Sequence, residues 1–165
     1  MSPVSVEVAQ AITQKMVRYT RYVDTKQWDK LEKEVALPDA RFVYIDPSGK
    51  EIRVGKAVYA FSKTKDLVNT LRIGLEGKQI LHMIGPGDFE QTAPNEVMAI
   101  FALEDQTVVP TPFNLVEVRG GGYYHGTWRE VNGEWFIAEL RMERIYHRMT
   151  LLAQIGLFLM NTFGL

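Results

Sequence analysis

The sequence contains no cysteine among its 165 residues. This absence excludes disulfide frameworks, thiolate zinc sites and cysteine nucleophiles, and it fits a reducing compartment such as the cytoplasm, where we expect the protein. The chain also lacks an excess of either charge, because 19 basic and 20 acidic residues leave a formal net charge of −1. The sequence therefore has no excess of basic residues that would indicate a nucleic-acid partner.

Long uninterrupted hydrophobic runs are scarce as well. Residues 1–10 contain Glu7 and no apolar centre, so they do not resemble a signal peptide. Residues 150–165 are apolar, but the segment is short and Gly156 interrupts it, which makes it a poor membrane span. We expect residues 148–165 to form an apolar C-terminal helix or lid on the domain, with no stable membrane insertion.

What the sequence does contain is the composition of a globular domain, with 46% apolar and 24% charged residues. The length suits one domain over residues 1–165 with a sizeable core. The three histidines, at positions 82, 125 and 147, have no spacing that suggests a metal site. We therefore expect neither a metal nor another cofactor.

The first half of the chain is predicted to be mainly helical. Apolar residues recur at helical spacing over residues 8–23 and again over residues 56–70. Asp24 and Gln27 form the ends of a capping-box pattern that predicts a second helix, which Pro38 ends. A short strand over residues 41–45 and a turn at 46–49 follow, and residues 52–54 are candidates to pair back on that strand.

From residue 80 onward the pattern changes to strands. We predict strands over residues 80–84, 96–105, 115–118, 123–131 and 135–146, with turns at 85–88 and at Asn132-Gly133. The three glycines at 120–122 suit a β-bulge or a sharp bend. Helices followed by antiparallel strands indicate an α+β fold, with the helices on one face of a bent sheet.

Strand alternation predicts which side chains share a face. If Phe101 and Leu103 face the interior, Asp105 faces it too, and Glu104 does not. On the last strand the pattern separates two sets, with Ala138, Leu140, Met142 and Arg144 on one face and Glu139, Arg141 and Glu143 on the other.

Three segments resemble a known family. Residues 22–31 (Tyr-Val-Asp-Thr-Lys-Gln-Trp-Asp-Lys-Leu) resemble the helix corner of scytalone dehydratase, residues 81–85 (Leu-His-Met-Ile-Gly) its catalytic-histidine strand, and residues 128–135 its final hairpin. Their order and spacing over about residues 8–146 are similar to the SnoaL-like branch of the NTF2-like superfamily. The resemblance implies a cone-shaped domain with an apolar pocket, in which N-terminal helices pack on a strongly curved, mostly antiparallel sheet. It also implies a homo-dimer or homo-trimer.

The resemblance also implies a set of catalytic residues. The spacing is similar to that of the bacterial bile acid 7α-dehydratases, and it implies catalytic roles for Tyr19, Asp24, His82 and Asp105, with an arginine on the last strand. Arg144 is the first candidate for that arginine and Arg141 the second.

The implied substrate-binding residues are Tyr44, Tyr124, Arg144, Phe101 and Met142. With Tyr124 inside the pocket, alternation places His125 on the outer face. The sequence departs from scytalone dehydratase, because Val23 and Thr107 replace a tyrosine and a histidine of that enzyme and Tyr124 stands at the position of its pocket asparagine. Scytalone is therefore not the expected substrate.

These residue types suit acid–base chemistry. A histidine can take a proton from carbon, and a carboxylate on its far nitrogen fixes its orientation. Asp24 and Asp105 are both candidates for that carboxylate. Phenols and Arg144 can stabilise a developing oxyanion. The predicted function is a cofactor-independent dehydratase or isomerase acting on a hydrophobic polyketide, terpenoid or steroid-like intermediate in secondary metabolism.

Other interpretations remain open. Asp24, Arg144 and Asp105 are also the residue types of a limonene-type epoxide hydrolase, and a non-catalytic module that binds small molecules would need none of this chemistry. Asp24 is a good helix N-cap, His82 is flanked by apolar residues of a strand, and Arg144 lies in a series of alternating charges. A purely structural role would explain each of them.

Overall fold

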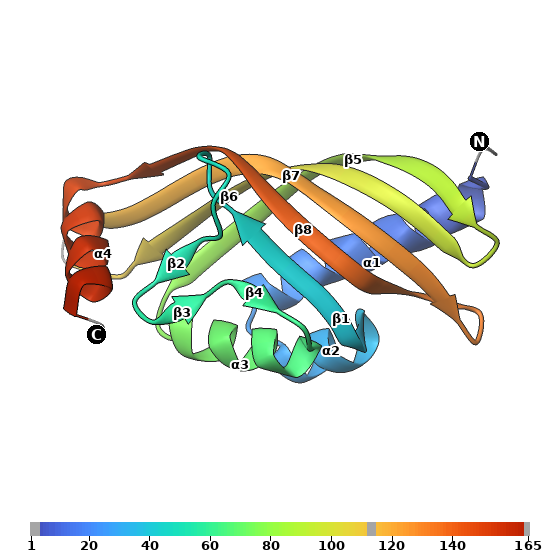
Figure 1. Ribbon diagram of the computed structural model, residues 1–165, viewed down its shortest axis with the longest axis horizontal. Coiled ribbons are helices and arrows are strands. Elements are labelled where there is room, and N and C mark those ends of the chain that lie inside the picture. Colours follow the sequence, from blue (N-terminus) through green and yellow to red (C-terminus); the bar gives the residue numbers. More distant parts are fainter. Residues whose placement is uncertain (1–3, 112–114, 164–165) are drawn as a thin grey trace.

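Three N-terminal helices cover one face of a strongly curved six-stranded sheet, as the computed structural model shows (Figure 1). The structure describes residues 4–111 and 115–163, so the predicted 1–165 domain and the 148–165 segment both extend beyond the described residues. The helices on the sheet are α1 (Val6–Asp24), α2 (Trp28–Glu34) and α3 (Thr64–Gly74). A fourth helix, α4 (Leu151–Phe163), stands at the end of the sheet away from the N-terminus.

The sheet has the strand order β4-β1-β8-β7-β6-β5. Its strands are β1 (Ala36–Ile45), β4 (Ala60–Phe61), β5 (Gln79–Ala93), β6 (Glu96–Val109), β7 (Val116–Val131) and β8 (Glu134–Met149). Only the β1–β8 pair is parallel. A separate hairpin joins β2 (Arg53–Val54) to β3 (Ala57–Val58). The predicted α+β arrangement is confirmed.

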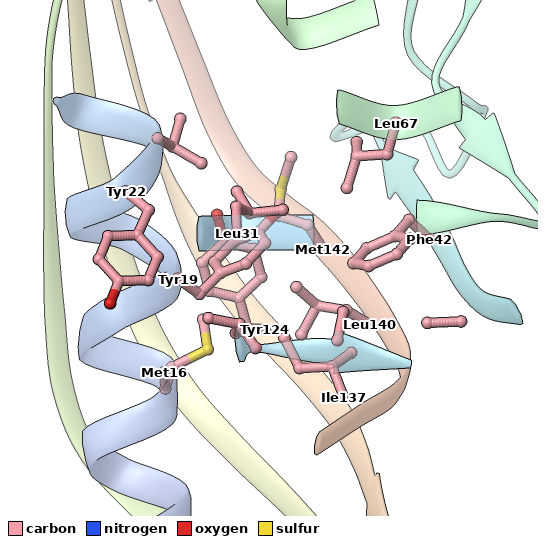
Figure 2. Packing of buried hydrophobic residues seen from close by; sticks show 14 of the residues in the cluster. Met16, Tyr19, Tyr22, Leu31, Phe42, Leu67, Tyr124, Ile137, Leu140 and Met142 are labelled. Carbon is pink, nitrogen blue, oxygen red and sulfur yellow. The ribbon is translucent and has the colours of Figure 1, made fainter. Parts of the chain in front are cut away.

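Helix α1 forms the inner layer against the sheet. Ser5 caps it, because the Ser5 hydroxyl accepts the backbone N–H of Val8 at 3.3 Å. Ile12, Met16 and Tyr19 lie on one face at helical spacing and are at most 2% exposed. All three belong to the core cluster, and Met16 and Tyr19 lie next to residues of β7 and β8 (Figure 2).

Cross-strand pairing arranges the inner side chains of the sheet in rows. Phe101, Tyr124, Met142 and Tyr44 are direct neighbours on β6, β7, β8 and β1, and all four are buried. These are four of the five predicted substrate-binding residues. The rows exist because side chains of cross-strand partners project to the same face of a sheet.

Two bulges on β8 change the predicted alternation. The pairing with β7 skips Ala138 and again skips Ile145, the second time opposite Gly121 and Gly122. The bulge expected at the glycines is present, although the extra residue is on the partner strand. The prediction that Ala138 shares the inner face with Leu140 is wrong, because the first bulge brings Ile137 into the core instead.

The predicted boundaries around the second helix are wrong in two respects. Gln27 is the N-cap of α2 and makes no side-chain capping bond, so Asp24 does not open that helix. The helix ends at Glu34, and Pro38 lies inside β1. The β1–β8 register is irregular between Ala36 and Arg41, so the sheet tolerates a residue without an N–H there.

Four other predictions differ from the structure at least in part. Residues 56–70 are not one helix, because β3 and β4 occupy positions 57–61 before α3 starts. Residues 52–54 pair back on β1 only at their start, where the Ile52 N–H donates to the Tyr44 carbonyl at 2.8 Å next to a bridge between Glu51 and Ile45. Arg53 and Val54 pair with β3 instead. The glycines at 85 and 87 do not make a turn. They belong to the continuous strand β5, whose register with β6 shifts between Ile84 and Gly87. Likewise, the two strands predicted at 115–118 and 123–131 form the single strand β7.

Candidate active site

His82 and Asp24 form a close pair between α1 and β5. Asp24 is the last residue of α1, which packs on β5. The Asp24 Oδ1 atom lies 2.6 Å from Nδ1 of His82, and Oδ2 accepts the His82 backbone N–H at 3.1 Å. Each side chain keeps 13% of its surface exposed. Because both carboxylate oxygens hold the histidine, Asp24 fixes both the position and the ring orientation of His82.

Asp105 and Arg144 form a second buried pair next to the first. The guanidinium donates Nη1–H to Oδ2 at 2.5 Å and Nη2–H to Oδ1 at 3.1 Å. Such a fork is the strong geometry for an arginine and a carboxylate. The Arg144 side chain is 12% exposed and the Asp105 side chain 9%. The buried Nε of Arg144 has no hydrogen-bond partner among the described residues, so one donor of the guanidinium is left over.

The two pairs adjoin because His82 and Asp105 are direct cross-strand partners on β5 and β6. The row continues to Gly120 on β7, and a Cβ atom at this position would overlap the Arg144 guanidinium. Gly120 therefore provides the space in which Arg144 reaches Asp105. Of the two carboxylates considered for orienting His82, it is Asp24 that contacts the imidazole.

The predicted tyrosines at 19, 44 and 124 are buried in the core, and Figure 2 shows Tyr19 of α1 next to Tyr124. The hydroxyls of Tyr19 and Tyr44 are 2.7 Å apart, and the Tyr124 ring meets the Tyr19 ring edge-on with centroids 6.0 Å apart. Burial raises the pKa of all three phenols above its ordinary value. They are therefore neutral hydrogen-bond donors over the physiological pH range.

Two other candidates lie outside this group. Arg141 points to the outer face, where its Nε is 2.6 Å from Oε1 of Glu143. His125, predicted on the same face, has its Nε2 3.6 Å from Oε2 of Glu143. The structure thus brings Arg144, and not Arg141, to Asp105.

One residue of this cross-strand row, His147, is not among the predicted site residues. Gly120 pairs with His147 on β8, so the row runs His82, Asp105, Gly120, His147 across four strands. Simple alternation from Arg144 places His147 on the opposite face, and the skipped Ile145 reverses this. The glycines at 120–122 were the available signal, since they predict a bulge in this region.

A large open cleft lies elsewhere on the molecule. It has a volume of about 1010 Å³ and contains none of the predicted site residues. Its lining includes Lys15, Lys33, Lys63, Lys65 and Phe136. The cluster around His82 is instead a partly exposed set of polar groups at the edge of the apolar interior.

Comparison with known proteins gives a consistent family. A family model described as SnoaL-like domain matches residues 4–141. A protein of Gibberella zeae named as a cyclase, FGR4, is 37% identical over 146 residues, which cover 88% of this chain and 97% of that protein.

Solved structures share the fold at low sequence identity. Kfla4162 from Kribbella flavida has a TM-score of 0.75 at 14% identity, over 91% of this chain and 99% of that chain. A protein from Novosphingobium aromaticivorans assigned as a scytalone dehydratase has a TM-score of 0.68 at 14% identity, over 84% and 85% of the two chains.

Proposed function

Because this chain belongs to the SnoaL-like domain family, we propose that it is a cofactor-independent lyase or isomerase that removes a proton from a carbon next to a carbonyl group. The observation that carries the proposal is the His82–Asp24 pair, whose Nδ1 to Oδ1 distance is 2.6 Å. A carboxylate on one imidazole nitrogen leaves the other, Nε2, as the base.

The proposed first step is an enolisation. His82 takes the proton, the electron pair of the C–H bond forms a carbon–carbon double bond, and the carbonyl oxygen becomes an enolate. Neutral phenols and the unused Nε–H of Arg144 are suitable donors for that oxygen. In a dehydration the enolate then expels a β-hydroxyl group, which leaves as water after taking up a proton. In an isomerisation the proton returns to another carbon.

The proposed substrate is a hydrophobic polyketide, terpenoid or steroid-like intermediate of secondary metabolism. The row of Phe101, Tyr124, Met142 and Tyr44 supports this, because it makes the interior aromatic and aliphatic on the face of the sheet that carries the polar pairs. The relative named as a cyclase is compatible with such a substrate. Cyclisation through an enolate would begin with the same proton transfer.

The contacts favour this proposal over an epoxide hydrolase. A limonene-type site needs an arginine between two aspartates that together activate water. Arg144 bonds to Asp105, but the carboxylate of Asp24 is taken by His82. Incorporation of labelled oxygen from water into a diol product would support the hydrolase instead.

A simple ketone tests the proposed proton transfer without the natural substrate. We expect the protein to accelerate exchange of the α-hydrogens of 2-tetralone in D₂O, followed by proton NMR. His82→Ala should lower this rate by about 10²-fold or more, as loss of a general base does. His125→Ala is the matched control, since it removes the outer-face histidine. Equal rates in the two variants, or no acceleration by the wild type, would contradict the proposed chemistry, and the latter would leave a binding module.

A further inference from the structure

His147 lies at the far end of the row that starts at His82. The pairs His82–Asp105, Asp105–Gly120 and Gly120–His147 are direct neighbours on β5, β6, β7 and β8. Direct partners project to one face of a sheet, so His147 faces the same side as His82. Adjacent strands are about 4.8 Å apart, so three intervals separate the two backbones by about 14 Å.

The contacts of neighbouring residues independently place His147 on the inner face of the sheet. Tyr146 belongs to the outer face, because its hydroxyl donates to Oε1 of Glu104 at 2.8 Å and a Cβ at Gly121 would meet its ring. A Cβ at Gly120 would instead meet the buried Arg144 guanidinium. His147 follows Tyr146 and pairs with Gly120, so it lies on the inner face with Arg144.

The Asp105–Arg144 pair lies between the two histidines. The Asp105 carboxylate and the Arg144 guanidinium form an ion pair, so together they present a surface without net charge over Gly120. A ketone bound over this pair would lie between the two histidines, with its α-carbon toward His82 and its carbonyl oxygen toward His147. No other histidine faces this side, since His125 contacts Glu143 on the outer face.

Resting on the function proposed above, we propose that His147 is a second catalytic residue, which donates a hydrogen bond to the substrate carbonyl oxygen while His82 removes the neighbouring proton. The C–H bond breaks, the proton goes to Nε2 of His82, and the negative charge that develops on oxygen accepts the N–H of His147. No proton needs to leave His147, so the step balances with a neutral imidazole.

The surroundings of His147 fit this role. Burial and the Arg144 guanidinium lower the pKa of His147, and Asp105 and Asp46 oppose that shift in part. A neutral imidazole can polarise a carbonyl group, and a lowered pKa keeps it neutral for this purpose. Its ring makes no hydrogen bond to another described residue, in contrast to the ring of His82, which Asp24 holds.

Exchange of the α-hydrogens of 2-tetralone separates this proposal from the one on which it rests. We expect His147→Leu to lower kcat by about 10²-fold with little change in KM, since a donor to a developing oxyanion acts mainly in the transition state. His147→Gln, which keeps an N–H donor, should recover a large part of the rate. His125→Leu, the same change on the outer face, should leave it unchanged.

The outcomes are distinct. If His147→Leu exchanges at the wild-type rate while His82→Ala does not, the role of His147 is wrong and the proposed function stands. If His82→Ala is also unaffected, the proposed function itself fails.

A measurement on the wild-type protein covers the case in which His147→Leu does not fold. 2-Naphthol is the aromatic counterpart of the enol of 2-tetralone. On its addition to ¹⁵N-histidine-labelled protein, the ring resonances of His82 and His147 should shift and those of His125 should not. An unchanged His147 ring in the presence of bound 2-naphthol would overturn the proposal.

Discussion

His82 and Asp105 are direct cross-strand neighbours, yet the side chain of each pairs with a different charged residue. Asp24 at the end of α1 holds the imidazole, and Arg144 from β8 holds the Asp105 carboxylate. The guanidinium thus neutralises the carboxylate that lies beside the histidine in the sheet. As a result, only Asp24 is free to orient His82.

Asp24→Asn tests this orientation. An asparagine keeps an oxygen for the His82 backbone N–H but no longer fixes the imidazole tautomer, so exchange of 2-tetralone hydrogens should fall by about 10²-fold or more. Asp29→Asn is the matched control, because the Asp29 side chain is 82% exposed on α2. Equal rates in the two variants would show that Asp24 serves only the fold.

The Asp105–Arg144 pair should contribute to stability as a unit. Arg144→Met leaves the Asp105 carboxylate buried without its partner, and breaking such a pair costs about 3–5 kcal/mol of unfolding free energy. The double variant Asp105→Leu, Arg144→Met should recover most of that loss, since no buried charge remains. Urea unfolding measures both.

Arg141→Met is the control for this pair. Arg141 bonds to Glu143 on the outer face and is 51% exposed, so its loss should cost less than about 1 kcal/mol. If Arg144→Met lowers the free energy of unfolding no more than Arg141→Met does, the buried Asp105–Arg144 pair does not stabilise the fold as its burial indicates.

The three inner tyrosines should make the free energy of unfolding fall at alkaline pH. Burial raises the pKa of Tyr19, Tyr44 and Tyr124 in the folded state above the ordinary value of 10.0. Their contribution is therefore complete below about pH 10 and is lost as the pH rises above it, because only the unfolded state releases these protons. In an absorbance titration at 295 nm, we expect these phenols to ionise together with unfolding. Ionisation of all seven tyrosines near pH 10 with the fold intact would contradict the burial of these three.

The sequence was sufficient for the parts of the fold that depend on regular repeats. Strand β6 pairs with β7 without a register shift, so simple alternation placed Phe101, Leu103 and Asp105 on one face. On β8 the same rule failed twice, at Ala138 and Ile145, because a bulge adds a residue at each place and only the second bulge has a signal in the sequence, the glycines of the partner strand. That failure is why His147 was missed.

The hydrogen-bond partners of the site residues could not be predicted from local sequence patterns. Asp24 and Gln27 fit a capping box, but the Asp24 carboxylate binds His82, which is 58 residues away in the sequence. The packing of α1 on β5 decides between the two roles, and it depends on the whole core. The family resemblance was the signal that grouped these residues.

Helix α4 gives the last prediction, which concerns assembly. It carries no charged residue, and only Ala153 among its residues is buried. Its exposed large apolar side chains are Leu151, Leu152, Ile155, Phe158, Leu159, Met160 and Phe163. None of the helices in the described part of the chain is long and apolar enough to cross a membrane. An apolar surface of this kind is typical of a protein–protein interface, and we expect a second copy of the chain to cover it.

Truncation after Thr150 tests the role of α4 while keeping the contacts of Thr150 with Leu115 and Glu117. By sedimentation, the full chain should be a dimer or trimer and the truncated chain a monomer that still exchanges 2-tetralone hydrogens. Arg141→Glu, on the outer sheet face, should leave the mass unchanged if α4 forms the interface. A truncated chain of unchanged mass but raised KM would instead make α4 a lid over the site, and a chain changed in neither respect would exclude both roles.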